Sequence, residues 1–174
     1  MGYYDSEFNE AESDYARLHR WPLPEEYAHL ILTREQVEER LSAGEDPIDL
    51  SLEKWERIYQ VYKNFSKDLL PYKYYYSLYK RIGYETCALC LDSTNKYIQQ
   101  FGPILYHNDK CKVCALAVVE RCTAAGSTYL AIDHLLFDET GIERTPFKSE
   151  YEEKNKLLGE LLETMIENIK SLKK

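Results

Sequence analysis

The sequence SLEKWERIYQVYKNFSKDL, residues 51–69, carries the strongest helical signal in the chain. Its apolar residues recur mainly at steps of three and four, which is the spacing of one face of an α-helix. The stretch follows a turn at Asp46-Pro47, and Ser51 is the expected N-cap. We therefore predict a long amphipathic helix whose apolar face is formed by Leu52, Trp55, Ile58, Tyr59, Tyr62, Phe65 and Leu69.

The same spacing extends to both sides of this stretch. Upstream, Thr33 and Gln36 stand three residues apart, as the partners of a capping box do, and they predict a short helix. Downstream, Pro71 interrupts the spacing, because proline removes a backbone donor. A second helix is predicted to follow it and to end at Ile82.

The C-terminal half contains three further apolar segments. Residues 113–121 and 128–137 are short runs in which Ala and Leu favour helix. Residues 149–172 carry a broad apolar stripe after Ser149, which we expect to cap a long helix that packs on the body. Helical spacing thus dominates the chain, and the predicted fold class is mainly α.

The charge of this 174-residue chain divides it into two parts. The net charge is −8, but residues 1–50 alone contain 13 acidic and 4 basic residues. We predict an acidic N-terminal helical arm over residues 1–50 and a Tyr-rich helical body over residues 51–174, joined as one compact unit. An acidic surface disfavours nonspecific binding of nucleic acid and favours basic partners.

Several classes of protein are excluded by missing patterns. No run of 18 apolar residues is present, so no membrane span is predicted. The N-terminus, Met1 to Asp5, is acidic and aromatic and does not resemble a secretory signal, so a cytoplasmic location is expected. The chain has no phosphate-binding glycine loop, HExxH or GxSxG motif, and we predict that it is not an enzyme.

Four of the five cysteines form two CxxC pairs. CALC at residues 87–90 and CKVC at residues 111–114 are separated by twenty residues, a spacing typical of zinc sites. Zinc favours four thiolates in a tetrahedron, and such a closed shell leaves no position for an activated water. We therefore predict a structural zinc knuckle over residues 84–126, held by Cys87, Cys90, Cys111 and Cys114.

Other interpretations of the cysteines stay open. An iron–sulfur cluster also takes four thiolates, and a redox-active or metal-free pair is the remaining alternative. Cys122 lies eight residues after Cys114 and would share its face of a helix, so it is a further candidate ligand or a small buried residue. His107 is a candidate ligand, with a solvent-exposed loop histidine as the alternative.

Tyrosines gather next to the first cysteine pair. Eight of the sixteen tyrosines fall between residues 59 and 84, interleaved with Lys and Arg. Such residues stack on bases and bind phosphates, form protein interfaces, or pack in the core. The candidate binding surface consists of Tyr72, Tyr75, Tyr76, Tyr79, Lys73, Lys80 and Arg81.

The cysteine segment also carries a family resemblance. CALC, then CKVCAL, then Cys122 followed by GSTY at residues 126–129, resembles a pattern in uncharacterised small proteins of phages and mobile elements. Ala115 and Thr128 each occupy a position where that pattern has proline. The resemblance covers roughly residues 84–130 and implies an intracellular, metal-holding domain of viral type.

These observations together predict a small, mainly α-helical domain with a central four-cysteine zinc knuckle. The predicted function is a non-enzymatic, intracellular zinc-binding protein that binds and modulates a host or defence macromolecule through its acidic and Tyr-rich surfaces. The alternative is a zinc-stabilised protein that binds nucleic acid or a nucleotide through the Tyr/Lys cluster at residues 72–84.

Overall fold

A computed structural model describes residues 21–65, 70, 74–106, 108–137 and 148–174, except for the side chains of residues 148–151. Regular structure in these ranges is helical and no strand occurs in them, which confirms the mainly α prediction. Short 3₁₀ helices are η2 (Tyr84–Thr86), η3 (Asp109–Val113) and η4 (Ala115–Val118). The α-helices are α2 (Glu25–Ala28), α3 (Arg34–Ser42), α4 (Pro47–Asn64), α5 (Tyr75–Ile82), α6 (Ala88–Phe101), α7 (Thr128–Leu136) and α8 (Lys148–Ser171).

The amphipathic helix predicted from residue 51 is α4, and it begins earlier than expected. Asp46 is its N-cap: Oδ1 accepts hydrogen bonds from the backbone N–H of Ile48 at 2.7 Å and of Asp49 at 3.2 Å. Pro47 occupies the first turn, where a missing N–H costs nothing. The predicted cap at Ser51 is wrong, because Ser51 lies inside α4 and is 0% exposed.

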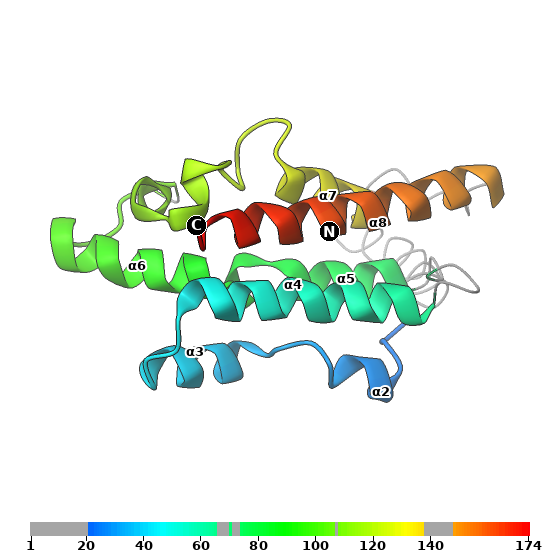
Figure 1. Cartoon of the computed structure of the whole chain (residues 1–174), viewed down its shortest axis with the longest axis horizontal. Coiled ribbons are helices and arrows are strands. Elements are labelled where there is room, and N and C mark those ends of the chain that lie inside the picture. The colour runs from blue at the N-terminus through cyan, green and yellow to red at the C-terminus, as the bar shows by residue number, and fades with distance from the viewer. Residues whose placement is uncertain (1–20, 66–69, 71–73, 107, 138–147) are drawn as a thin grey trace, which may run out of the picture.

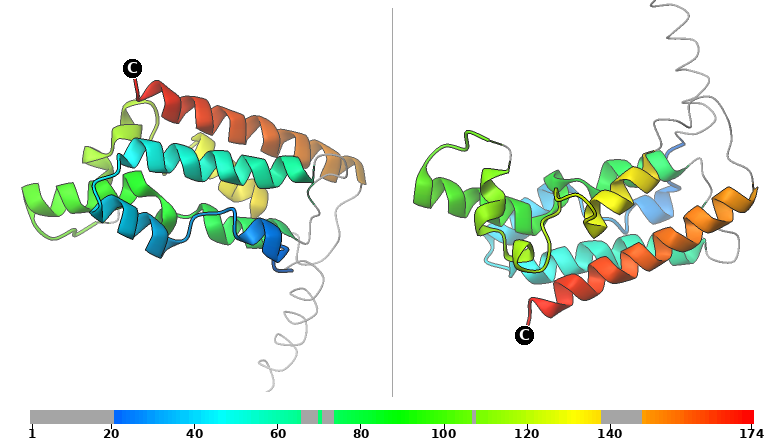
Figure 2. Two further views of the ribbon diagram at one scale, coloured as in Figure 1. Left: turned by 60° about the horizontal axis from the view of Figure 1, so that its bottom comes forward. Right: turned by 90° about the horizontal axis from the view of Figure 1, so that it is seen from above.

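The helices are arranged around α4. Figure 1 shows α4 in the middle, with α2 and α3 along one side and α8 along the other. Figure 2 shows that α6 starts beside α3 and α4 and then extends beyond the other helices. None of the helices in the described ranges is both long enough and apolar enough to cross a membrane.

The main core lies where α4, α5, α7 and α8 meet. Each large aliphatic side chain buried there stabilises the fold by about 1.5–3 kcal/mol. The predicted stripes of α4, α7 and α8 supply most of these side chains. Eight aliphatic side chains of the main core are 0% exposed: Ile58, Val61, Leu70, Leu78, Ile132, Leu158, Leu162 and Ile169.

The described part of the predicted acidic arm packs against the body. Ile31 is 1% exposed and belongs to the main core, and the Arg57 guanidinium of α4 donates to the Leu30 carbonyl at 3.0 Å. The capping box of α3 is present, since Gln36 N–H donates to Thr33 Oγ1 and Thr33 N–H donates to Gln36 Oε1. Leu32, Val37, Leu50 and Ala88 form a second, smaller core.

The segment between the cysteine pairs differs most from expectation. No helix was predicted there, but α6 covers residues 88–101. Only Ala88, Leu89 and Ser93 of this helix are buried, so its apolar stripe is too short to be recognised by periodicity. Conversely, residues 113–121 do not form an α-helix and contain only the last residue of η3 and the short η4.

Asn155 of α8 joins three elements inside the core. It is 2% exposed, and its Nδ2 donates to the Leu70 carbonyl and to the Tyr75 hydroxyl, each at 3.1 Å. Its own carbonyl accepts a hydrogen bond of 2.9 Å from the Tyr62 hydroxyl of α4. These bonds satisfy polar groups that would be costly to bury alone, and they fix α8 against α4 and α5.

The close contact between α4 and α8 gives a test of this packing. A Cβ added at Gly159 would lie 2.6 Å from the Tyr62 hydroxyl and 2.9 Å from ring carbons. Overpacking costs about 1–3 kcal/mol, whereas Ala in a helix gains up to about 1 kcal/mol over Gly. We expect Gly159→Ala to lower the free energy of unfolding by about 1 kcal/mol in urea titrations. In a Tyr62→Leu background the same change should be neutral or stabilising; equal losses in both backgrounds would contradict this contact.

Candidate functional site

The first cysteine pair lies at the N-terminus of α6. Cys87 is the residue that caps this helix and Cys90 lies in its first turn. α4 holds this end in place, because Ser51 Oγ accepts a hydrogen bond of 3.1 Å from the backbone N–H of Leu89. A helix N-terminus favours negative charge, so this position suits a thiolate.

The second pair lies on the 3₁₀ turns that follow α6. Cys111 is within η3, and Cys114 joins η3 to η4. Asp109 organises the turn: its carboxylate accepts from Tyr106 N–H at 3.1 Å and from Lys112 Nζ at 3.0 Å. The hydrogen bond from Lys112 holds the pKa of Asp109 below its usual value.

Cys122 reaches the same region from a separate loop. It does not continue a helix from Cys114, so the shared helical face that we expected is wrong. Ser127 Oγ donates to the Cys122 carbonyl at 2.7 Å. Glu120 accepts from the Thr128 N–H of α7 and from Asn168 Nδ2 of α8, each at 3.0 Å. The loop is thereby tied to both helices.

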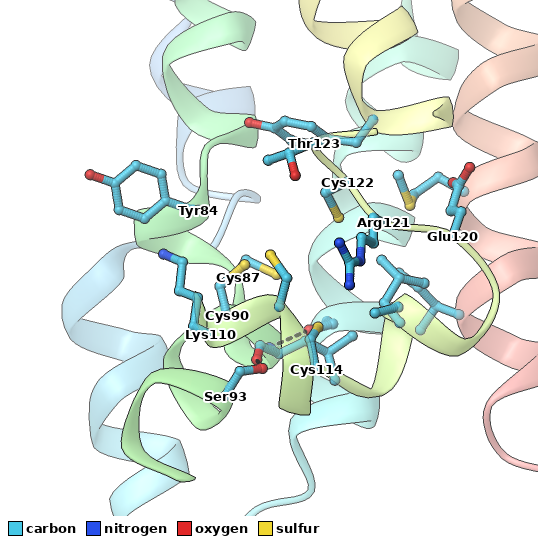
Figure 3. Close-up of a pocket in the computed structure, with 18 of the residues that line it drawn as sticks. Tyr84, Cys87, Cys90, Ser93, Lys110, Cys114, Glu120, Arg121, Cys122 and Thr123 are labelled. Atoms are coloured by element: carbon cyan, nitrogen blue, oxygen red, sulfur yellow. Dashed lines mark hydrogen bonds between the residues drawn. The ribbon is translucent and has the colours of Figure 1, made fainter. Parts of the chain in front are cut away.

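All five cysteines line one cavity of about 100 Å³ (Figure 3). Each is half-buried, and each is a free thiol. α4, α6, the 3₁₀ turns, the loop before α7, and α8 all contribute to its wall. Cysteine pairs that are twenty residues apart in sequence therefore face a common space, together with the fifth cysteine.

The thiols of this cavity differ in acidity. The Cys90 thiol donates a hydrogen bond to the Cys87 sulfur; this bond, the nearby Lys54 ammonium and the Ser51 hydroxyl lower the pKa of Cys87. The same bond raises the pKa of Cys90. Burial raises the pKa of Cys122 to about 12 and raises that of Cys111 as well. Cys87 is accordingly the thiol that ionises most readily.

Lys54 is a site residue that sequence reasoning missed. It is 0% exposed, and its Nζ donates to the Ile82 carbonyl at 2.7 Å and to the Gly83 carbonyl at 3.0 Å. Burial lowers its pKa, whereas Cys87 and the other nearby thiols favour its charged form. A signal was available, because Lys54 lies four residues from Ile58 and therefore on the apolar face of the predicted helix.

The four-cysteine zinc knuckle itself is not formed by the described residues. Among them, no three His, Cys, Asp or Glu side chains lie close enough together to hold one metal ion. The cavity brings the cysteines near one another without drawing their sulfurs to a single centre. His107 lies outside the described residues.

The described tyrosines of the candidate binding surface are buried or pack against other rings. Tyr75 is 2% exposed and belongs to the core, so its ring is not available at the surface. Tyr79 stacks on Phe137 at 4.8 Å between centroids, and Lys80 Nζ lies 5.5 Å from the Tyr76 centroid. Arg81 is half-buried at the C-terminal end of α5. Tyr72 and Lys73 lie outside the described residues.

Comparison of the chain with protein-family models, with curated proteins and with solved structures gives no match.

The link between α4 and α6 can be tested through Ser51. Replacing Ser51 by Ala removes the only acceptor seen for the Leu89 N–H among the described side chains, and an unsatisfied buried N–H costs about 1–3 kcal/mol. We expect Ser51→Ala to lower the free energy of unfolding by that amount in urea titrations. Ser42→Ala, which removes an exposed hydroxyl from the end of α3, should change it by less than about 0.5 kcal/mol. A neutral Ser51→Ala would contradict the structural role of this bond.

Proposed function

We propose that the chain is a zinc-binding helical protein whose zinc is structural. The observation that carries the proposal is the convergence of two CxxC pairs and Cys122 on one small cavity. Cys87, Cys90, Cys111 and Cys114 are the proposed ligands, with Cys122 as the alternative to one of them. Reduced thiols in this number suit a soft, four-coordinate metal such as zinc.

The donor set fits such an ion, and the cavity has room for one. A volume of about 100 Å³ exceeds the space of a single water molecule. When bound, zinc would supply a cross-link between the start of α6 and the 3₁₀ turns after it. The energy of metal binding then becomes folding energy for this end of the molecule. A shell of four thiolates has no open position for catalysis, in accordance with a non-enzymatic role.

We further propose that the protein acts by binding another macromolecule, a host or defence factor. Support comes from the charge of residues 25–49, called here the acidic segment. Its two arginines are already paired, Arg34 with Glu38 at 2.7 Å and Arg40 with Glu45 at 2.7 Å. The segment holds eight acidic residues and these two arginines, so its net charge is negative, and it suits a basic protein surface. The exposed acidic residues are Glu25, Glu26, Glu35, Glu38, Glu39, Glu45, Asp46 and Asp49.

Binding of nucleic acid is the weaker candidate. Base stacking needs exposed ring faces, but Tyr75 is buried and one face of Tyr79 lies against Phe137. The acidic segment would also repel phosphates. No described feature favours this function over protein binding.

Elemental analysis of the purified protein tests the metal site. We expect about one zinc ion per chain, and no visible absorption of the kind that an iron–sulfur cluster gives. Cys87→Ser and Cys111→Ser should each lose zinc and lower the Tm by about 4–8 °C, the shift that about 2 kcal/mol produces in a domain of this size. Removal of zinc from the unaltered protein with a chelator should lower the Tm similarly.

Ser93→Ala is the matched control, because Ser93 lines the same cavity but carries no thiol. It should retain zinc. Cys122→Ser completes the series. Full zinc content in Cys122→Ser would identify the four CxxC thiols as the ligands. If Cys122→Ser loses zinc and Cys111→Ser retains it, Cys122 takes the place of Cys111 in the ligand set. Unchanged zinc and Tm in Cys87→Ser would contradict the proposed site.

The acidic segment is tested by charge reversal. Glu35 and Glu39 are exposed on α3, and replacing both with Lys should weaken capture of a partner from host lysate at least tenfold. The control pair is Glu153→Lys with Glu160→Lys, which makes the same charge change on the exposed side of α8. Equal losses in both pairs would show that net charge, and not this segment, governs binding.

A further inference from the structure

We propose that Lys54 is the counter-charge of the thiolate centre: its buried ammonium stabilises the cysteine thiolates that hold the metal ion. The inference rests on the proposed zinc site and assigns a role to a residue outside the ligand set. Lys54 is a positioning residue in this proposal, because it acts on the metal through the cysteines.

The position of Lys54 is unusual for a lysine. Its side chain extends from the middle of α4 into the wall of the cysteine-lined cavity and is 0% exposed. Lysine is almost never fully buried unless it is paired with an opposite charge. Yet no carboxylate among the described residues forms an ion pair with it, and its observed acceptors are two backbone carbonyls, those of Ile82 and Gly83.

These two carbonyls do not balance the charge. They fix the direction of the ammonium group, but they are neutral, and a lysine ammonium has three N–H donors. All five cysteines line the same cavity as Lys54. The carboxylate on the cavity wall, Glu120, already accepts hydrogen bonds from Thr128 and Asn168. The Trp55 ring, whose centroid lies 5.2 Å from Lys54 Nζ, carries no net charge. The cysteines are therefore the groups of the cavity wall that can supply a counter-charge when they are deprotonated.

A metal centre explains why a cation is retained here. Four thiolates around Zn²⁺ leave a net negative charge, which is costly in a half-buried site. A fixed ammonium beside them lowers that cost without becoming a ligand. In the absence of metal the ammonium faces fewer thiolates, and a buried ion pair is often no more stabilising than uncharged groups of similar size.

This difference between the two states is the basis of the test. We would measure the zinc affinity of the full chain by competition with a chromogenic chelator, and the urea midpoint of the metal-free protein. Lys54→Met removes the charge, and Lys54→Gln removes it while keeping a donor for the two carbonyls. The control is Lys63→Met, which neutralises an exposed lysine on the same helix.

We expect both Lys54 variants to bind zinc about 10- to 100-fold more weakly, the range typical of groups that support metal ligands. The metal-free urea midpoint of Lys54→Gln, which keeps a donor for the two carbonyls, should equal or exceed that of the unaltered protein, and Lys63→Met should match the unaltered protein in both measurements. This combination separates a counter-charge from a purely structural lysine, whose loss would lower the metal-free midpoint.

Zinc affinity within twofold of the unaltered protein in Lys54→Gln would overturn the proposal. So would a lower metal-free midpoint in Lys54→Gln, or loss of its helical circular dichroism, because the charge of Lys54 would then be needed for the fold itself. If the unaltered protein binds no zinc, the proposed function fails first, and the role of Lys54 fails with it.

Discussion

The hydrogen bonds that α4 sends to the turn between α5 and α6 are the constraint on which the cysteine end of the molecule depends. Lys54 holds the carbonyls of Ile82 and Gly83, and Ser51 holds the N–H of Leu89. One bond set fixes where α5 ends and the other fixes where α6 begins. Because Cys87 lies between these points, two polar residues on an otherwise apolar helix face determine where the first thiol is placed.

α8 closes the cysteine-lined cavity on another side. Asn155 and Tyr62 lock α8 against α4, and Met165 and Ile169 of α8 complete the apolar wall of the cavity. Apolar walls around a group of thiols keep water away and strengthen electrostatic interactions inside. The helical body thus surrounds the thiols and Lys54 with an environment of low dielectric constant.

How far the sequence predicted this structure depended on the kind of signal each element carries. The capping box of Thr33 and Gln36 correctly predicted α3, and apolar stripes predicted α4, α7 and α8. The caps predicted at Ser51 and Ser149 are wrong, because both residues lie inside their helices. α6 escaped prediction because one of its three buried residues is Ser93, whose hydroxyl is satisfied by its own helix through the Leu89 carbonyl. The two CxxC motifs identified cysteines that line one cavity. They carried no information on Lys54, because its burial depends on how the helices pack against each other.

Glu120 attaches the loop before α7 to two helices. Its carboxylate binds the first turn of α7 with one oxygen and Asn168 of α8 with the other, two residues from Cys122. One carboxylate therefore links the position of α8 to that of the segment that carries the fifth cysteine, although α8 contributes no thiol to the cavity.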